Sequence, residues 1–205
     1  MSFNKNLKKQ CNLKNNRLCI GLDFDNKWFQ NDSLDYMQGF IKDVIESTID
    51  LCPVYKINFA FYEKHGFAGY EILEKIPSFI NGRAVAIADA KRGDIGNSSK
   101  YYAESIFDCL NYDSITVSPY MGHDSLEPFV KYKDKGVFIL ALTSNPGSEN
   151  FQKMIFKSDE LYKHVIRLAN DLNNDNNVGL VVGATNHQYL DEIKKEASLL
   201  PWLMP

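Results

Sequence analysis

The chain has 205 residues, of which 44% are hydrophobic and 24% are charged, and its formal net charge is −3. This size and composition fit one globular domain with a sizeable core, and the slightly acidic balance excludes the basic surface that nucleic-acid binding requires. No apolar run approaches the roughly 20 residues of a membrane span, so we expect no membrane contact.

The polar, Lys-rich N-terminal segment 1–16 contains no apolar stretch, so it is interpreted as neither a signal peptide nor an anchor. The four cysteines along the chain are dispersed, with no CxxC motif and no zinc-like spacing. We interpret them as reduced thiols. Together these observations favour a cytoplasmic location.

Short apolar segments recur along the chain and alternate with segments of helical periodicity. The segments predicted to form strands are 18–24, 54–59, 84–91, 114–120, 137–144, 178–185 and 199–205. After the first strand, apolar residues recur every three or four positions from Leu34 to Thr48, with Asp32 or Ser33 as the N-cap. Similar periodicity predicts helices over 161–172 and about 186–197, and the residues from Gly96 to Ser99 can begin another.

Strict alternation of strands and helices predicts a parallel α/β sheet with right-handed crossovers. Seven strands at this spacing favour a (β/α)₈ TIM barrel that lacks its last strand and final helices. We therefore expect one incomplete barrel domain over residues 1–205. A doubly wound open sheet is the alternative, which is disfavoured because residues 21–25 read GLDFD rather than a glycine-rich phosphate fingerprint.

The third predicted strand ends in a run of charges. Its residues 84–88 are almost wholly apolar, as in a strand buried on both faces, and Asp89, Lys91 and Asp94 follow. Strand alternation places Asp89 and Lys91 on the same face, and a glycine-flanked turn can bring Asp94 back toward them. A lysine between carboxylates is a stabilised cation with a proton to donate, and desolvating such a cluster costs too much for packing alone.

Other predicted strands also end in polar residues, and in a barrel such positions are typical of catalytic groups. Asp23 ends the first strand, and Lys56 lies on an otherwise apolar second strand, where a buried lysine needs a partner. Taken alone, Asp23 can simply cap a turn, and residues 143–147 can simply form one. We nevertheless expect five charged residues to converge on one rim: Asp23, Lys56, Asp89, Lys91 and Asp94.

The run DAKRGDIGNS, from Asp89 to Ser98, resembles the signature of the orotidine 5′-phosphate decarboxylase family, and more narrowly that of its second bacterial-type subgroup. Segments 18–23, 55–63, 114–122 and 143–148 resemble further motifs of the family. The resemblance begins at residue 18 and covers essentially all of the chain that follows.

The resemblance implies decarboxylation of orotidine 5′-phosphate to UMP and CO₂, without a metal or an organic cofactor. Lys91 would donate the proton to C6 of the pyrimidine, flanked by Asp89 and by an Asp94 that comes across a homodimer interface. Lys56 would complete the charged network. Asp23 would hold a ribose hydroxyl, Ser144 would contact the base, and Ile95 and Ser98 would line the partner's site. The full set of expected substrate-binding residues is Asp23, Ile95, Ser98, Ser144, Asn145 and Pro205.

This chemistry fits the residues. Loss of CO₂ from C6 leaves a carbanion-like centre, which a fixed ammonium can stabilise as it develops and then protonate. Carboxylates fixed beside Lys91 would keep it charged at neutral pH.

Two alternatives stay open at the level of the sequence. One is a related sugar-phosphate aldolase or decarboxylase that uses a divalent metal, against which the context Arg92-Gly93 and the residues from Ile95 to Asn97 argue. The other is an inactive remnant that serves only as a partner subunit. In the family, a glycine-rich segment with a glutamine and a final strand would follow Pro205, so our hypothesis is a truncated chain.

Overall fold

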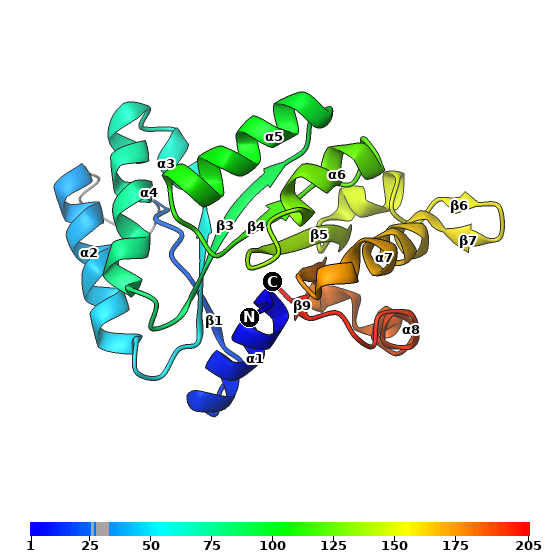
Figure 1. Ribbon diagram of the computed structural model, residues 1–205, viewed down its shortest axis with the longest axis horizontal. Helices are drawn as coiled ribbons and strands as arrows, with labels where there is room; N and C mark the ends of the chain where they lie inside the picture. The colour runs from blue at the N-terminus through cyan, green and yellow to red at the C-terminus, as the bar shows by residue number, and fades with distance from the viewer. Residues whose placement is uncertain (26, 28–32) are drawn as a thin grey trace. The chain divides into compact units, whose positions relative to one another are not determined.

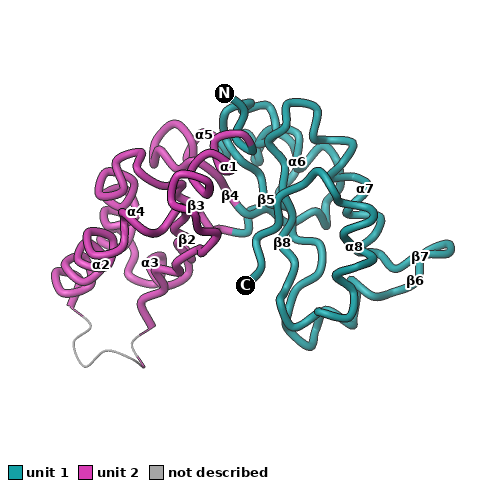
Figure 2. Tube along the Cα trace, turned by 90° about the horizontal axis from the view of Figure 1, so that it is seen from below, with its two compact units in different colours: residues 1–4, 91–103, 116–205 teal, residues 5–90, 104–115 magenta. Residues whose placement is uncertain are grey.

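The computed structural model describes residues 1–25, 27 and 33–205 (Figure 1). These residues form two compact units, which Figure 2 distinguishes by colour. Unit 1 comprises residues 1–4, 91–103 and 116–205, and unit 2 comprises residues 5–90 and 104–115. The boundary falls between Ala90 and Lys91, within a strand, so each unit is described by itself.

Seven strands follow one another in one sheet in the order β1-β2-β3-β4-β5-β8-β9. The pairs β1–β2, β2–β3, β5–β8 and β8–β9 are all parallel. All seven predicted strands are present, with shorter bounds in most cases, which confirms the parallel α/β sheet. The bounds are β1 (Cys19–Gly21), β2 (Val54–Asn58), β3 (Val85–Arg92), β4 (Ser114–Val117), β5 (Gly136–Leu142), β8 (Val178–Val182) and β9 (Trp202–Leu203).

Unit 2 carries the helices that follow the first two strands and a π-helical turn that comes after β3. They are α2 (Leu34–Thr48), α3 (Ala60–Glu63), α4 (Phe67–Ile80) and the π-helical turn η1 (Ser105–Cys109). The Ser33 hydroxyl accepts a hydrogen bond from the Tyr36 N–H, which confirms Ser33 as the N-cap of α2, whereas Asp32 lies outside the described residues. The helix buries one stripe, Met37, Ile41 and Ile45, as its periodicity predicts.

Unit 1 carries the later helices and a small antiparallel hairpin. They are α5 (Gly96–Glu104, whose last residue belongs to unit 2), α6 (His123–Val130), η2 (Pro146–Asn150), β6 (Ile155–Phe156), β7 (Asp159–Glu160), α7 (Leu161–Leu172), η3 (Asn173–Asp175), η4 (Ala184–Tyr189) and α8 (Leu190–Glu196). The helix predicted over 161–172 is confirmed. The helix predicted over 186–197 is regular only from Leu190, because a 3₁₀ segment with a kink at Asn186 (φ −90°, ψ 34°) precedes it.

The N-terminal segment forms a helix that the sequence analysis does not predict, α1 (Phe3–Leu13). Phe3 is 1% exposed and packs edge-on against Phe138 of β5, with ring centroids 6.0 Å apart. Gly136 makes room for this ring, because a Cβ there would lie 2.3 Å from it. No helix among the described residues is both long and apolar enough to cross a membrane.

Candidate active site

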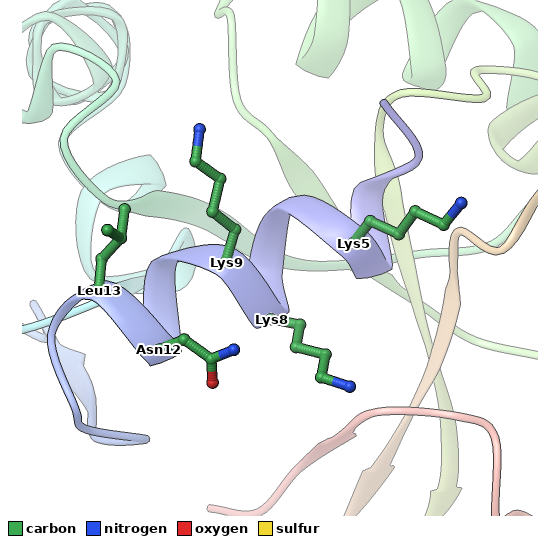
Figure 3. A pocket seen from close by; sticks show the side chains of 5 residues that line it. All are labelled: Lys5, Lys8, Lys9, Asn12 and Leu13. Carbon is green, nitrogen blue, oxygen red and sulfur yellow. The ribbon is translucent and has the colours of Figure 1, made fainter.

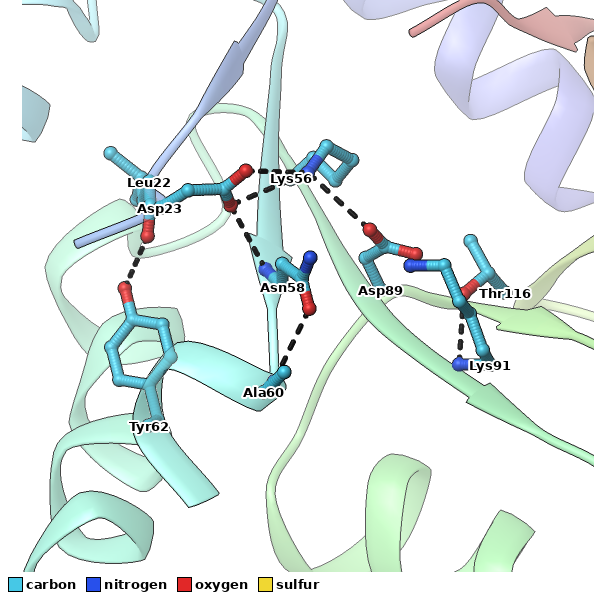
Figure 4. Close-up of polar contacts among 9 residues, drawn as sticks. All are labelled: Leu22, Asp23, Lys56, Asn58, Ala60, Tyr62, Asp89, Lys91 and Thr116. Atoms are coloured by element: carbon cyan, nitrogen blue, oxygen red, sulfur yellow. Dashed lines mark hydrogen bonds and ion pairs between the residues drawn. The ribbon is translucent and has the colours of Figure 1, made fainter. Parts of the chain in front are cut away.

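Unit 2 contains a cluster of one lysine and two carboxylates at the ends of its strands, which we call the charged cluster: Asp23, Lys56 and Asp89 (Figure 4). The Lys56 ammonium lies 3.3 Å from Asp23 Oδ2 and 3.4 Å from Asp89 Oδ2. The Lys56 and Asp89 side chains are 14% and 9% exposed, so each charge depends on its partner for the interactions that water would otherwise supply. The prediction that Lys56 has a charged partner is confirmed.

Strand register explains why these side chains meet. In the parallel pairing, Gly21 lies opposite Lys56 and Asn58 lies opposite Asp89, so Asp23 just after β1, Lys56 on β2 and Asp89 on β3 come from three neighbouring strands. Residues 85–88 of β3 are all nearly inaccessible, which anchors Asp89 at the end of a buried strand.

Hydrogen bonds fix the loop that carries Asp23. Its Oδ1 accepts from the Asn58 N–H at 3.3 Å. The Leu22 carbonyl accepts from the buried Tyr62 hydroxyl at 2.5 Å, and burial raises the pKa of that phenol. Asp23 therefore has a fixed position, while its side chain remains 35% exposed and open to a ligand.

Burial also affects a thiol in this part of unit 2. Desolvation raises the pKa of Cys19, on β1, to about 12 despite the opposing charge of Lys56. A thiol with such a pKa is protonated at neutral pH and is a poor nucleophile. We therefore assign Cys19 no part in the chemistry.

Lys91 is the first residue of the second segment of unit 1 and has an unusual backbone. Its φ is +48°, in the left-handed region, although it lies within β3. Its backbone N–H donates to Thr116 Oγ1 at 3.0 Å (Figure 4). The expected alternation of side chains requires an extended backbone through Lys91, and the backbone is not extended at this residue.

Asp94 lies two residues before the start of α5, where local hydrogen bonds hold it. Its Oδ1 accepts from the Ile95 N–H at 2.7 Å, and its carbonyl accepts from the Ser99 hydroxyl at 2.7 Å. Ile95 is 59% exposed, which is unusual for a large aliphatic side chain at the start of a helix, and Ser98 is half-buried one turn further on. The predicted helix beginning at Gly96 is confirmed as α5.

After β5, unit 1 contains a network of neutral side chains that we call the amide network: Thr143, Asn145, Gln152 and Asn186. The Thr143 N–H donates to Gln152 Oε1 at 2.7 Å, and its carbonyl accepts from Asn186 Nδ2 at 2.9 Å. The Thr143 hydroxyl also donates to Asn145 Oδ1 at 2.6 Å. Side-chain amides thus satisfy both backbone polar groups of a residue that has just left the sheet.

Ser144 follows this fixed residue and lies against Gly183. A Cβ on Gly183 would approach the Ser144 nitrogen to 2.7 Å and its Cβ to 2.9 Å. The Ala184 N–H donates to the Pro205 carbonyl at 3.0 Å, so Pro205 also lies at this end of β8. Four contributors to the geometry were missed by the sequence analysis: Thr116, Gln152, Gly183 and Asn186.

The structure thus brings together Asp23, Lys56 and Asp89 by direct contact in unit 2. In unit 1 it positions the remaining predicted residues at strand ends and at the start of α5. The expectation that all five charged residues share one rim joins the two units and stays a prediction. Among the described residues, no three His, Cys, Asp or Glu side chains are grouped as a metal ion would require.

A separate pocket lies along α1, lined by Lys5, Lys8, Lys9, Asn12 and Leu13 (Figure 3). The three lysines project from the helix in different directions and do not converge on one point. None of the residues that line this pocket carries a carboxylate, hydroxyl or thiol that could act in catalysis.

Comparisons with known proteins agree with the geometry. Residues 16–201 match the model of the orotidine 5′-phosphate decarboxylase / HUMPS family. The whole chain is 46% identical to an orotidine 5′-phosphate decarboxylase of Dehalococcoides mccartyi (strain CBDB1) and spans 77% of it. Over 92% of the chain, 44% of residues are identical to the orotidine 5′-phosphate decarboxylase of Christiangramia forsetii, of which the match spans 72%.

Solved structures match over the full chain as well. The OMP decarboxylase of Leishmania donovani superposes with a TM-score of 0.91 at 38% identity, and 80% of that chain is covered. A putative orotidine-monophosphate-decarboxylase from Toxoplasma gondii gives a TM-score of 0.94 at 33% identity, with 78% of that chain covered. These matches confirm the TIM-barrel fold class, and the chain belongs to the orotidine 5′-phosphate decarboxylase family.

Proposed function

We propose that this chain decarboxylates orotidine 5′-phosphate to UMP and CO₂, the last step of UMP biosynthesis, with Lys91 as the proton donor. The observation that carries the proposal is the charged cluster, in which the Lys56 ammonium is held between Asp23 and Asp89 at the ends of parallel strands. Lys91 follows Asp89 by two residues, in the run DAKRGDIGNS that resembles the family signature.

The proposed chemistry uses amino-acid side chains alone. The bond between C6 and the carboxylate carbon breaks, CO₂ leaves, and the electron pair stays on C6. The Lys91 ammonium stabilises this developing charge and then transfers its proton to C6, which gives UMP. Asp89 would flank the ammonium, and Lys56 would hold the Asp89 carboxylate in place through their ion pair at 3.4 Å.

Substrate binding falls to residues at the ends of several strands. Asp23 would accept a hydrogen bond from a ribose hydroxyl, because its position is fixed and its side chain is 35% exposed. Ser144 would contact the base from a main chain that the amide network fixes. Asn145 and Pro205 would complete the substrate-binding set near the same strand ends.

We also propose a homodimer in which each chain lends Asp94, Ile95 and Ser98 to its partner's site. The exposure of Ile95 (59%), just before α5, and of Tyr101 on α5 (63%) supports this, because exposed large apolar side chains are typical of an interface. A single incomplete barrel domain over residues 1–205 and a cytoplasmic location are part of the same proposal. The four cysteines are free thiols, as a reducing compartment favours.

The test follows the ultraviolet absorbance of orotidine 5′-phosphate as purified chain is added. We expect turnover by the wild type that EDTA leaves unchanged, and loss of turnover in Lys91→Ala. Loss of wild-type turnover on addition of EDTA would instead favour a metal-dependent reaction, as in the related sugar-phosphate enzymes. Wild-type protein that is folded by circular dichroism yet does not turn over, or a Lys91→Ala variant as active as the wild type, would refute the proposal.

A further inference from the structure

The backbone of Lys91 is strained in a way that no turn explains. The other non-glycine residues with positive φ that the structure describes are Asn15, Asn81, Asn111, Lys157 and Asn176. Asparagine tolerates this region, and Lys157 lies in the turn between β6 and β7. Lys91 is the one such residue that lies within a strand of the described chain. A left-handed conformation costs a residue with a Cβ about 1–2 kcal/mol.

Such a conformation persists when the surrounding structure holds it. Here the Lys91 N–H donates to the hydroxyl of Thr116, a β4 residue that is 1% exposed. The next residues are held as well, because the Ser118 N–H donates to the Arg92 carbonyl at 2.8 Å. Gly93 lies so close to Ser118 that a Cβ there would be 3.1 Å from both its Cβ and its carbonyl oxygen.

The Thr116 hydroxyl therefore satisfies the backbone at the point where β3 departs from extended geometry. We propose that Thr116 is a positioning residue, whose hydroxyl holds Lys91 in its left-handed conformation and so sets the direction in which the ammonium is presented. The kinetic part of this inference rests on the proposed function. The conformational part does not, because it concerns the backbone of Lys91 whatever the substrate.

Loss of the hydroxyl should release the strain. Without this acceptor, Lys91 gains free energy by relaxing toward negative φ, and its Cα–Cβ bond then points in another direction. A displacement of about 1 Å at a reacting group costs on the order of 10²-fold in rate. Substrate binding by other residues should change far less, so the effect belongs mainly in kcat.

The test compares Thr116→Val, which keeps the shape and lacks the hydroxyl, with Thr116→Ser, which keeps the hydroxyl. We expect Thr116→Val to lower kcat by roughly 10- to 100-fold with KM within about threefold, and Thr116→Ser to restore most of the rate. The matched control is Ser114→Ala on the same strand, because the buried Ser114 hydroxyl makes no hydrogen bond to any described residue.

A second readout does not depend on turnover. Lysines are reductively methylated with ¹³C-formaldehyde, and the Lys91 resonance is identified by its loss in Lys91→Arg. Its chemical shift should move in Thr116→Val and return in Thr116→Ser. If folded Thr116→Val keeps both the wild-type kcat and the wild-type resonance, the inference is overturned. If the resonance moves while the wild type shows no decarboxylation, the proposed function fails and the positioning role stands.

Discussion

The charged cluster and the amide network position strand ends by different means. In the charged cluster, Asp23 follows β1, Lys56 lies on β2 and Asp89 lies on β3, and opposite charges hold the side chains themselves. In the amide network, neutral side chains hold the main chain of Thr143, and they come from segments 9 and 43 residues away. The charged cluster therefore fixes the positions of charged side chains, whereas the amide network fixes the path of the main chain.

This difference predicts different sensitivities. Removing one partner from a buried ion pair leaves an unpaired charge, which costs about 3–5 kcal/mol. Removing one amide from the network leaves an unpaired neutral group, which costs about 1–3 kcal/mol. Mutations in the charged cluster should therefore lower the free energy of unfolding more than mutations in the amide network. The two groups of mutations should also differ in how they change kcat and KM.

Lys56→Met should produce the largest effect. It leaves the nearly buried Asp89 without this counter-ion, so we expect the free energy of unfolding to fall by about 3 kcal/mol and decarboxylation to fall by at least a hundredfold. Urea denaturation and initial rates measure the two effects. The control is Lys42→Met, which breaks an exposed pair with Glu46 and should cost less than about 0.5 kcal/mol. Equal stability of the two variants would contradict a desolvated cluster.

Gly183→Ala should displace the main chain at Ser144, next to the amide network. The added Cβ would lie 2.7 Å from the Ser144 nitrogen, so the main chain must move, at a cost of about 1–3 kcal/mol and with a raised KM. Gly39→Ala is the control, because it adds a Cβ with no atom within 4 Å and lies inside α2, where alanine stabilises by about 0.5–1 kcal/mol. A Gly183→Ala variant with wild-type KM and stability would show that Ser144 has room to move.

Gln152→Leu should weaken the amide network and leave the charged cluster intact. The Thr143 N–H loses its acceptor, so we expect a loss of about 1–3 kcal/mol in urea denaturation, and a larger change in KM than in kcat. Gln152→Glu keeps an acceptor and should recover most of the stability. As a control, Gln38→Leu removes an exposed hydrogen bond to Lys75 and should cost a few tenths of a kcal/mol. A fall in kcat with no change in KM would contradict the role of Gln152 in positioning the main chain.

The smallest expected effect is at an ion pair whose carboxylate, Glu192, has a side chain that is 48% exposed. The Lys163 ammonium, 2.5 Å from Glu192, holds the pKa of that carboxyl below its usual range. Because the folded-state pKa is lowered, its stabilisation is present above about pH 4.5 and is lost as pH falls through the folded pKa. We expect Glu192→Gln to lose less than about 1 kcal/mol at neutral pH and to converge with the wild type in acid. Urea denaturation across pH 3–7 measures this, and a constant gap down to pH 3 would contradict it.

Predictions from the sequence are correct where the local residue pattern, or the cost of burying a single charge, determines the structure. The apolar run before Asp89 predicts a buried strand, and a lysine on the apolar segment 54–59 predicts a charged partner, because both depend on local pattern and on the cost of burial. Ser33 predicts the start of α2 for the same reason. The left-handed Lys91, the kink at Asn186 and the bonds of Gln152 were not predicted, since each depends on a side chain elsewhere in the fold.

The burial of Phe3 has a consequence for how the protein is made. Phe3 packs on Phe138, and Asn4 donates to the carbonyls of Asn176 and Val178, more than 170 positions later. At about 5–20 residues per second, synthesis separates these residues from their partners by roughly 7 to 35 seconds. Phe3 and Asn4 therefore leave the ribosome well before the groups that hold them, and they reach their native places only after those partners have been made.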